Sequence, residues 1–239
     1  MDLKEESILG DSIYDHWYYI SKSRAMRAFL KGLEPRVILD VGAGSGIFSK
    51  ILLQETSAQQ AICVDIGYPG PSEEVFAGKL IQFRTSVSKT EADLALFMDV
   101  IEHVDDDISL LRSYVSNLRK GAHVLITVPA FQFLFSGHDL FLEHRRRYTL
   151  PRVEAVVREA GLEVVKGSYF FAIICPIAVV QRLAQKVVNK SQLATPKSSL
   201  KKHMPIVNGA LKLLNALELP LLPFNRLVGL TVFCLARVP

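Results

Sequence analysis

Residues 37–49 carry an apolar run that leads into a turn with three alternating glycines, and this stretch constrains the fold more than any other. Val-Ile-Leu-Asp-Val is followed by Gly-Ala-Gly-Ser-Gly, with glycines at 42, 44 and 46. Glycine tolerates positive φ and has no Cβ, so such a turn is tight and its backbone can approach a ligand closely. A helix is predicted from about Ile47, with its free N–H groups directed at the turn. The stretch therefore indicates a buried strand, a cofactor loop and a helix.

The spacing of these glycines separates two classes of nucleotide cofactor. The dinucleotide fingerprint has glycines at its first, third and sixth positions, whereas the sixth position counted from Gly42 is Ile47. Asp-x-Gly-x-Gly-x-Gly resembles motif I of the class I S-adenosylmethionine-dependent methyltransferases instead. The resemblance implies S-adenosylmethionine as the cofactor, bound by Asp40, Gly42, Ala43, Gly44, Ser45 and Gly46. For the glycines alone, the alternative is a tight turn that binds no ligand.

Two later segments resemble the same family. Asp65 follows the predicted second strand, Ala-Ile-Cys-Val, where a carboxylate can accept hydrogen bonds from both ribose hydroxyls. Residues 92–104 resemble the fourth strand and its exit, with the buried run Leu94 to Met98 in front of an aspartate. Open α/β sheets bind ligands at the carboxyl ends of their strands. The resemblance therefore implies further cofactor contacts at Asp65, Ile66, Asp99 and Val100.

The alternation of strands and helical stretches predicts a doubly wound α/β fold with a mostly parallel, seven-stranded sheet. The family places a sixth strand and an antiparallel seventh at the end of the sheet, which we expect at 162–171 and 227–237. A connection between paired strands normally takes a few residues, so the long stretch between them is an insertion. The expected parts are an N-terminal helical lid (1–36), the cofactor-binding core (37–173), a helical insertion (174–226) and the final strand (227–239).

The expected insertion is strongly basic. Residues 1–173 hold 19 Lys or Arg against 23 Asp or Glu, a net charge of −4, whereas residues 174–226 hold 8 against 1, a net charge of +7. Apolar residues recur at helical spacing in 177–188 and 207–217. Apolar faces bordered by Lys and Arg suit an anionic membrane surface, and the aromatic residues of a single-strand binder are missing, so we expect no nucleic-acid partner. Packing on the sheet or a dimer interface is the alternative, which leaves monomer and homodimer both open.

Three further features bear on where the protein acts. The longest uncharged apolar run, 170–180, has 11 residues, whereas a transmembrane helix needs about 20. The first residues are acidic and polar, unlike a secretory signal. Cys63, Cys175 and Cys234 lack metal-ligand spacing and are interpreted as reduced core thiols. We expect a cytoplasmic protein that lies on the inner face of the cytoplasmic membrane if the insertion binds lipid.

The segment after the fifth strand contains the candidate substrate residues. Its His-Asp and His-x-Arg-Arg-Tyr-Thr elements resemble a subset of bacterial methyltransferases that act on lipid-like or glycan-linked molecules. His138 and His144 could take a proton from an attacking hydroxyl near neutral pH. A phosphate or carboxylate of the acceptor could be held by Arg145, Arg146 and Arg147. Of this segment, Arg146, Arg147 and Tyr148 are taken as the substrate-binding residues. The alternative is a solvated turn in front of a helix at 152–160.

Glu102 and His103 have three interpretations. With Asp99 they could hold a hard cation weakly, His103 could act as a general base, or His103 could have a structural hydrogen bond at a helix start. We predict no metal site and take His103, together with His138 and His144, as the candidate catalytic residues. Trp17 and Tyr19 resemble aromatic residues that lie over the cofactor or substrate in this family, which implies acceptor contacts for both.

These features together predict an S-adenosylmethionine-dependent methyltransferase, distantly similar to the ubiquinone-biosynthesis O-methyltransferases. It is expected to methylate an oxygen of a lipid-like or glycan-linked small molecule at the membrane surface. Three alternatives stay open: a soluble small-molecule acceptor, a non-catalytic subunit that binds the cofactor, and an NAD-dependent oxidoreductase.

Overall fold

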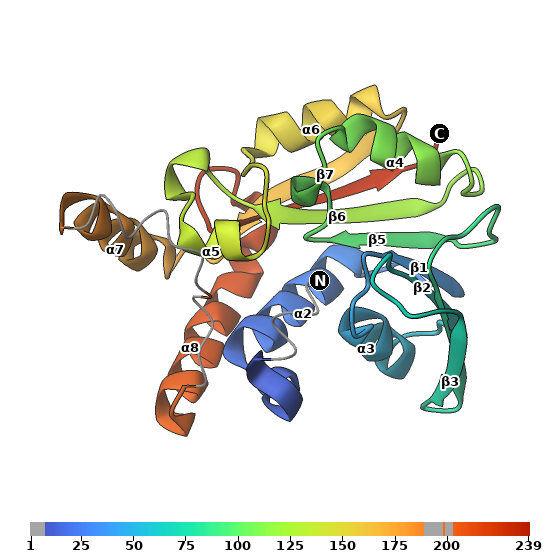
Figure 1. Ribbon diagram of the computed structural model, residues 1–239, viewed down its shortest axis with the longest axis horizontal. Helices are drawn as coiled ribbons and strands as arrows, with labels where there is room; N and C mark the ends of the chain where they lie inside the picture. The colour runs from blue at the N-terminus through green and yellow to red at the C-terminus, as the bar shows by residue number, and fades with distance from the viewer. Residues whose placement is uncertain (1–7, 189–197, 199–202) are drawn as a thin grey trace.

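An eight-stranded sheet runs through the computed structural model, which describes residues 8–188, 198 and 203–239 (Figure 1). The strand order is β3-β4-β2-β1-β5-β6-β8-β7. Neighbouring strands from β4 to β6 are parallel, β8 is antiparallel to β6 and β7, and β3 is antiparallel to β4. The strands are β1 (Val37–Val41), β2 (Gln60–Val64), β3 (Ser72–Phe76), β4 (Lys79–Arg84), β5 (Leu94–Met98), β6 (His123–Pro129), β7 (Glu163–Phe170) and β8 (Thr231–Arg237).

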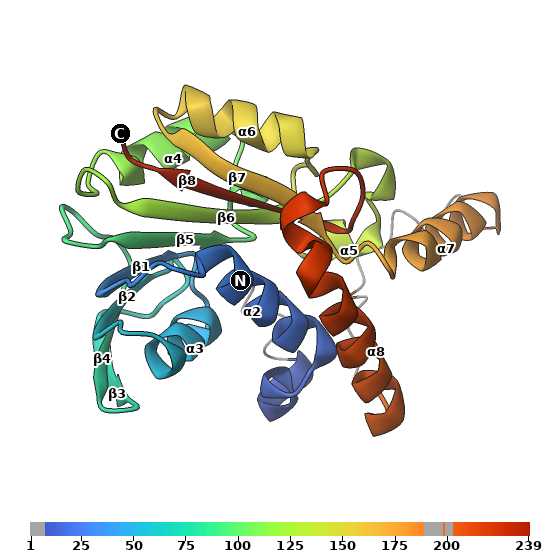
Figure 2. The ribbon, with the colours of Figure 1, turned by 180° about the vertical axis from the view of Figure 1, so that it is seen from behind.

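Helices cover both faces of this sheet (Figure 2). On one face α2 (Trp17–Leu30) and α3 (Ile47–Glu55) pack against the strands, and on the other α4 (Asp107–Val115) and α6 (Leu150–Glu159) do so. Successive strand residues alternate between two cores: Ile38 belongs to the core under α2 and α3, and Leu39 to the core under α4 and α6. The remaining described helices are η1 (Gly10–Tyr14), η2 (Ile101–His103), η3 (Gln132–Leu134), α5 (Gly137–Phe141), α7 (Cys175–Val188), α8 (Pro205–Glu218) and η5 (Leu219–Phe224).

The predicted doubly wound fold is confirmed, with one strand more than expected. The additional strand is β3, which pairs with β4 through a two-residue turn, Ala77-Gly78. Both turn residues have positive φ, 52° and 74°, as a tight hairpin requires. Sequence reasoning missed β3 because it is an edge strand with exposed polar residues such as Glu73. It covers the free edge of β4.

The chain leaves the sheet before the helical insertion and returns to it after the insertion at neighbouring residues, the end of β7 and the start of β8. The Leu230 N–H donates to the Phe170 carbonyl at 2.8 Å, beside the pairing of Phe170 with Thr231. A Cβ on Gly229 would lie 2.3 Å from the same carbonyl oxygen, so only glycine fits there. Beyond this point α7 extends away from the sheet and α8 lies beside α2 (Figures 1 and 2).

Candidate active site

The glycine loop after β1 meets the end of β5 at the crevice where the strand order reverses. Gly42, Gly44 and Gly46 have positive φ of 66°, 54° and 70°. A Cβ on Gly42 would lie 2.8 Å from Val100 Cγ2, so the loop passes the chain after β5 with no space for a side chain. Doubly wound sheets bind their ligands at this switch point. The predicted cofactor residues of β1 and β5 are therefore adjacent.

Asp65, at the end of β2, holds the glycine loop from the other side. Its Oδ2 accepts the Gly44 N–H at 3.0 Å and its Oδ1 accepts the Gly67 N–H at 2.8 Å. The Tyr68 hydroxyl, which sequence reasoning missed, donates to the Gly44 carbonyl. Ile66 is almost fully exposed beside the carboxylate. Asp65 thus lies within reach of the crevice while it fixes the loop.

Asp40 and Ser45 have different roles in the loop. Asp40 is buried and accepts a hydrogen bond from Ser49 Oγ on α3 at 2.7 Å, so it braces the loop from behind. Burial raises the pKa of Asp40 to about 6. Ser45 Oγ is buried with no hydrogen-bond partner among the described residues. Such a hydroxyl needs a ligand or water, and the loop therefore fits the polar methionine half of S-adenosylmethionine. The ribose contact of Asp65 stays a prediction.

A buried ion pair crosses the end of β5, and the sequence did not predict it. The fully buried Lys22 ammonium, on α2, contacts Asp99 Oδ2, to which the Tyr18 hydroxyl also donates at 3.2 Å. Thr127 Oγ1 donates to Asp99 Oδ1 at 3.0 Å. Burial raises the pKa of Asp99, but Lys22 more than offsets this, and the pKa lies below its usual value. Asp99 also has a positive φ of 57°, a conformation that is uncommon outside glycine, although Asp adopts it more readily than most residues.

Replacing Lys22 with Met is expected to lower the free energy of unfolding by about 3 kcal/mol, because it leaves a largely buried carboxylate without a counter-ion. Chemical denaturation of both proteins measures the difference. The same change at the exposed Lys120 is the control and should have almost no effect. Equal stabilities of the two variants would show that the ion pair does not hold α2 on the sheet.

Glu102, His103 and His144 come together although they are far apart in the sequence. The ring centroids of His103 and His144 are 4.8 Å apart. Glu102 is fully buried, and neither carboxylate oxygen has a hydrogen-bond partner among the described residues. Burial, together with the charge of Asp99, raises the pKa of Glu102 to about 8. This cluster adjoins the cofactor crevice because Glu102 and His103 follow β5 directly.

His144 is held in one orientation by Asp139. Its Nδ1 lies 3.0 Å from Asp139 Oδ1. Burial lowers the pKa of His144, but Asp139 and Glu102 raise it more, so the pKa lies above its usual value. His138 differs: burial lowers its pKa to about 4, so its imidazole is neutral near pH 7.

The three substrate-binding candidates of the segment after α5 have internal partners. Arg147 donates twice to Asp139, at 2.7 and 2.9 Å, and Arg146 donates to the backbone carbonyls of Val104 and Asp105. The buried Tyr148 hydroxyl donates to Asp107 Oδ2 at 2.7 Å. The bonds of Arg146 and Tyr148 hold the segment of His144 against residues 104–107, which follow β5, whereas the bonds of Arg147 to Asp139 lie within that segment. Acceptor contacts for the three residues stay a prediction.

Trp17 and Tyr19 lie at the start of α2. Tyr19 is buried and its ring is 6.4 Å from that of Phe48. Trp17 packs edge-on against Phe171, at the end of β7, with ring centroids 5.8 Å apart. Its Nε1 is buried with no hydrogen-bond partner in the described parts of the chain. Trp17 is therefore the better placed of the two for an acceptor contact, which also stays a prediction.

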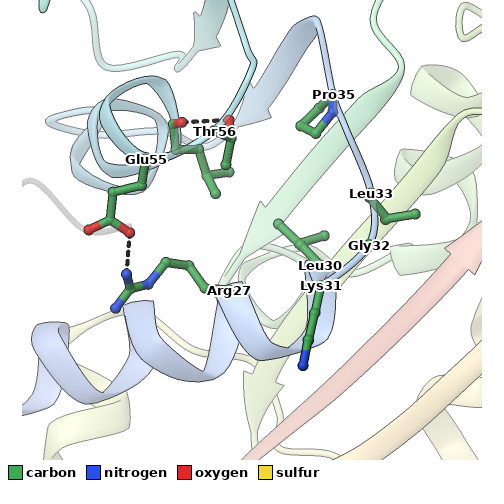
Figure 3. A pocket seen from close by; sticks show the side chains of 9 residues that line it. Arg27, Leu30, Lys31, Gly32, Leu33, Pro35, Glu55 and Thr56 are labelled. Atoms are coloured by element: carbon green, nitrogen blue, oxygen red, sulfur yellow. Dashed lines mark hydrogen bonds and ion pairs between the residues drawn. The ribbon is translucent and has the colours of Figure 1, made fainter.

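A cavity of about 420 Å³ lies at the other end of the sheet (Figure 3). Pro35, just before β1, lines it together with the ion pair of Arg27 and Glu55. The glycine loop follows β1, so the cavity lies at the amino ends of the strands. Doubly wound folds bind their cofactors at the opposite edge, and the cavity is therefore separate from the candidate active site.

Comparisons with known proteins agree with this geometry. A model of the methyltransferase-domain family matches residues 14–166, which is more than half of the chain. No curated protein matches the sequence. Three solved structures share the fold. The first is a putative Haloferax volcanii methyltransferase in complex with the Trm112 activator, with 13% identity and a TM-score of 0.56 over 96% of this chain and 92% of that one. The second is a putative Bacillus halodurans methyltransferase, with 13% identity and a TM-score of 0.53 over 92% of this chain and 98% of that one. The third is a SAM-dependent methyltransferase from Archaeoglobus fulgidus, with 18% identity and a TM-score of 0.52 over 92% of this chain and 93% of that one.

The matched residues include the glycine loop, the carboxylates at the ends of β2 and β5, and the histidine cluster. The oxidoreductase alternative is thereby set aside, and the predicted methyltransferase class is confirmed. The chain belongs to the methyltransferase-domain family and is an S-adenosylmethionine-dependent methyltransferase.

Proposed function

We propose that this enzyme methylates an oxygen of a lipid-like or glycan-linked acceptor at the cytoplasmic surface of an anionic membrane. The observation that carries the proposal is the orientation of α8. Its polar residues Asn208, Asn215 and Glu218 face inward, each less than 10% exposed. Asn208 accepts the Trp17 N–H at 2.8 Å, and Glu218 accepts the Ala172 N–H at 2.8 Å. The helix is thus attached to the molecule by its polar side.

Several apolar residues of α8 point the other way, whereas Leu211 packs against the core under α2 and α3. More than half of each side chain is exposed at Ile206, Leu213 and Leu217, and the same holds on α7 for Ile177, Val180 and Leu183. A helix that faces water shows the opposite pattern, with its apolar stripe turned to the core. Large exposed apolar surfaces mark binding sites for proteins or membranes. We call these six residues the apolar surface of the insertion.

Charge favours a membrane as the occupant of this surface. The insertion carries 8 Lys or Arg and 1 acid, and each basic residue near an anionic bilayer contributes about 1 kcal/mol. Arg226 pairs with Glu154 and Lys212 with Asp15, so these two are engaged internally. Others, Lys190, Lys197, Lys201 and Lys202, lie outside the described residues. Among the described residues, no helix has the length and apolar character needed to cross a bilayer.

The α7 part of the apolar surface belongs to the helix that carries Arg182, a neighbour of His138. Burial is the main cause of the low pKa of His138, followed by charges such as those of His144 and Arg147. The charge of Arg182 on α7 adds a smaller contribution, so Arg182 lies near His138. A lipid-like acceptor that lies against α7 would therefore present its polar group to His138 and His144. Phe133, more than half exposed after β6, offers a further apolar contact there.

The chemistry requires little from the chain beyond position and proton removal. S-adenosylmethionine supplies a methyl group on a positively charged sulfur. The protein holds the acceptor oxygen in line and excludes water, and a hydroxyl acceptor must also lose its proton. We propose His103, His138 and His144 as the residues of this step, with His144 favoured because Asp139 fixes its ring. Radiolabelled S-adenosylmethionine and a total lipid extract would identify the methylated product.

Changing Leu213 and Leu217 to Glu is expected to abolish binding to vesicles that contain anionic lipid, because it places two charges where the apolar surface meets the bilayer. Co-sedimentation at low and high salt measures the bound fraction, which should fall with salt for the unchanged protein. Changing Lys201 and Lys202 to Glu should weaken binding less.

The control for this experiment is Val75→Glu. Val75 is as exposed as these leucines but lies on β3, at the far edge of the sheet from α8 (Figure 1). Its substitution should leave the bound fraction unchanged. If the unchanged protein stays in the supernatant at low salt, the membrane proposal is wrong and a soluble acceptor is favoured.

A further inference from the structure

We propose that Glu102, His103 and His144 form a binding site for one divalent transition-metal ion of the zinc class. Each residue offers one ligand atom, and the three atoms lie within 4.8 Å of one another. Ligands of an ion at about 2.1 Å are at most about 4.2 Å apart, so a small side-chain movement closes the site. The sequence predicted no metal because His144 is far from Glu102 and His103 along the chain.

The carboxylate of Glu102 is the strongest argument for an ion. It is fully buried, and both of its oxygens lack a hydrogen-bond partner among the described residues. A buried carboxyl group without partners is costly in free energy whether it is neutral or charged, and native proteins keep one where a ligand or ion satisfies it. The Arg145 N–H donates to the Glu102 backbone carbonyl at 2.7 Å, which holds the segment of His144 against Glu102. The site is therefore assembled by the fold.

The surroundings of His144 match those of a metal ligand. Histidines that bind metals commonly donate their second ring N–H to a carboxylate, which fixes the ring and raises its basicity. Asp139 Oδ1 lies 3.0 Å from Nδ1 of His144, which leaves Nε2 for the ion. Asp139 is itself fixed by the two bonds from Arg147 and by the Ser136 N–H at 2.8 Å. The ligand and its support are thus both held in place.

The ligand set selects the kind of ion. Two imidazole nitrogens and one carboxylate oxygen suit zinc and similar first-row metals, whereas magnesium and calcium prefer oxygen ligands throughout. Three protein ligands leave a position open, as in catalytic zinc sites.

The metal's part in catalysis rests on the proposed function. At the open position the ion would lower the pKa of the acceptor hydroxyl, whose proton passes to water. The oxygen then forms a bond to the methyl carbon as the bond between that carbon and sulfur breaks. The electron pair of the broken bond stays on sulfur.

Titration of the metal-free, untagged protein with Co²⁺ tests the site without any acceptor. We expect one ion per chain, with the visible absorption of a site of low coordination number, and displacement by Zn²⁺. Glu102→Gln and His144→Gln should each weaken Zn²⁺ binding at least 100-fold, and Asp139→Asn by about 10- to 100-fold. The control, His123→Gln, changes a histidine at the start of β6, outside the cluster, and should bind Zn²⁺ normally.

Two results would overturn the proposal. One is a stoichiometry well below one ion per chain in the unchanged protein. The other is an unchanged affinity for Zn²⁺ in the Glu102→Gln and His144→Gln variants, once thermal unfolding has shown that both are folded. If a variant does not fold, the stoichiometry and spectrum of the unchanged protein decide. Methyl transfer that persists after chelation would remove the ion from catalysis but leave the proposed methylation standing, so the two proposals fail separately.

Discussion

Replacing His144 with Gln is expected to lower the rate of methyl transfer by about 10²- to 10⁴-fold while the affinity for S-adenosylmethionine stays unchanged. The reason is that both routes for the acceptor's proton involve this side chain. One route uses the imidazole as the base, and the other uses an ion bound to it. Turnover with radiolabelled cofactor and a lipid extract gives the rate, and calorimetry gives the cofactor affinity.

The corresponding Gln variants of His103 and His138 complete this test. A loss confined to His138 would move the proton acceptor to α5. Near-normal turnover in all three single variants would contradict every histidine assignment, and catalysis would then depend on the positioning of the acceptor alone.

Asp65→Ala is expected to weaken S-adenosylmethionine binding by about 2 to 4 kcal/mol, because two ribose hydroxyls lose a charged acceptor. The structure adds a second reason. The same carboxylate accepts the Gly44 N–H, so its removal also frees the glycine loop. Isothermal calorimetry on the folded variant measures the change.

Asp105→Ala is the control for the loss of an aspartate elsewhere in the protein, since Asp105 is highly exposed and lies outside the cofactor loop. It should bind the cofactor as tightly as the unchanged protein. An Asp65→Ala variant with an unchanged dissociation constant would exclude the ribose contact.

The sequence predicted those parts of the fold that depend on local patterns. The buried run Leu94 to Met98 is β5 without change, and the helix expected from Ile47 is α3. The glycine turn was predictable because positive φ at Gly42 has a clear sequence signature. The stretch between the last two strands was expected to be an insertion because paired strands normally need only a short connection, and the described helices α7 and α8 lie there. The boundaries of the expected parts stay a prediction.

Contacts between distant segments could not be predicted in the same way. The sequence places Lys22 on a basic helix but does not show that the fold buries it against Asp99. His144 lies beside Glu102 only because the segment after α5 packs against the end of β5. Arg147 was expected to contact the acceptor, which stays a prediction, and the structure adds a bond to Asp139 that the sequence did not indicate. Charge and spacing indicate which side chains can bind an anion, but only tertiary packing decides which of them remain available.

The insertion and the cofactor loop are attached to different strands of the sheet. Because the Leu230 N–H and the Phe170 carbonyl join the sheet at the point where the insertion begins and ends, a short turn could connect β7 and β8 without changing the register of either strand. The cofactor loop lies on β1, outside this junction. The segment between β7 and β8 could therefore be exchanged for another of different surface character while the cofactor loop and its strand stay unchanged.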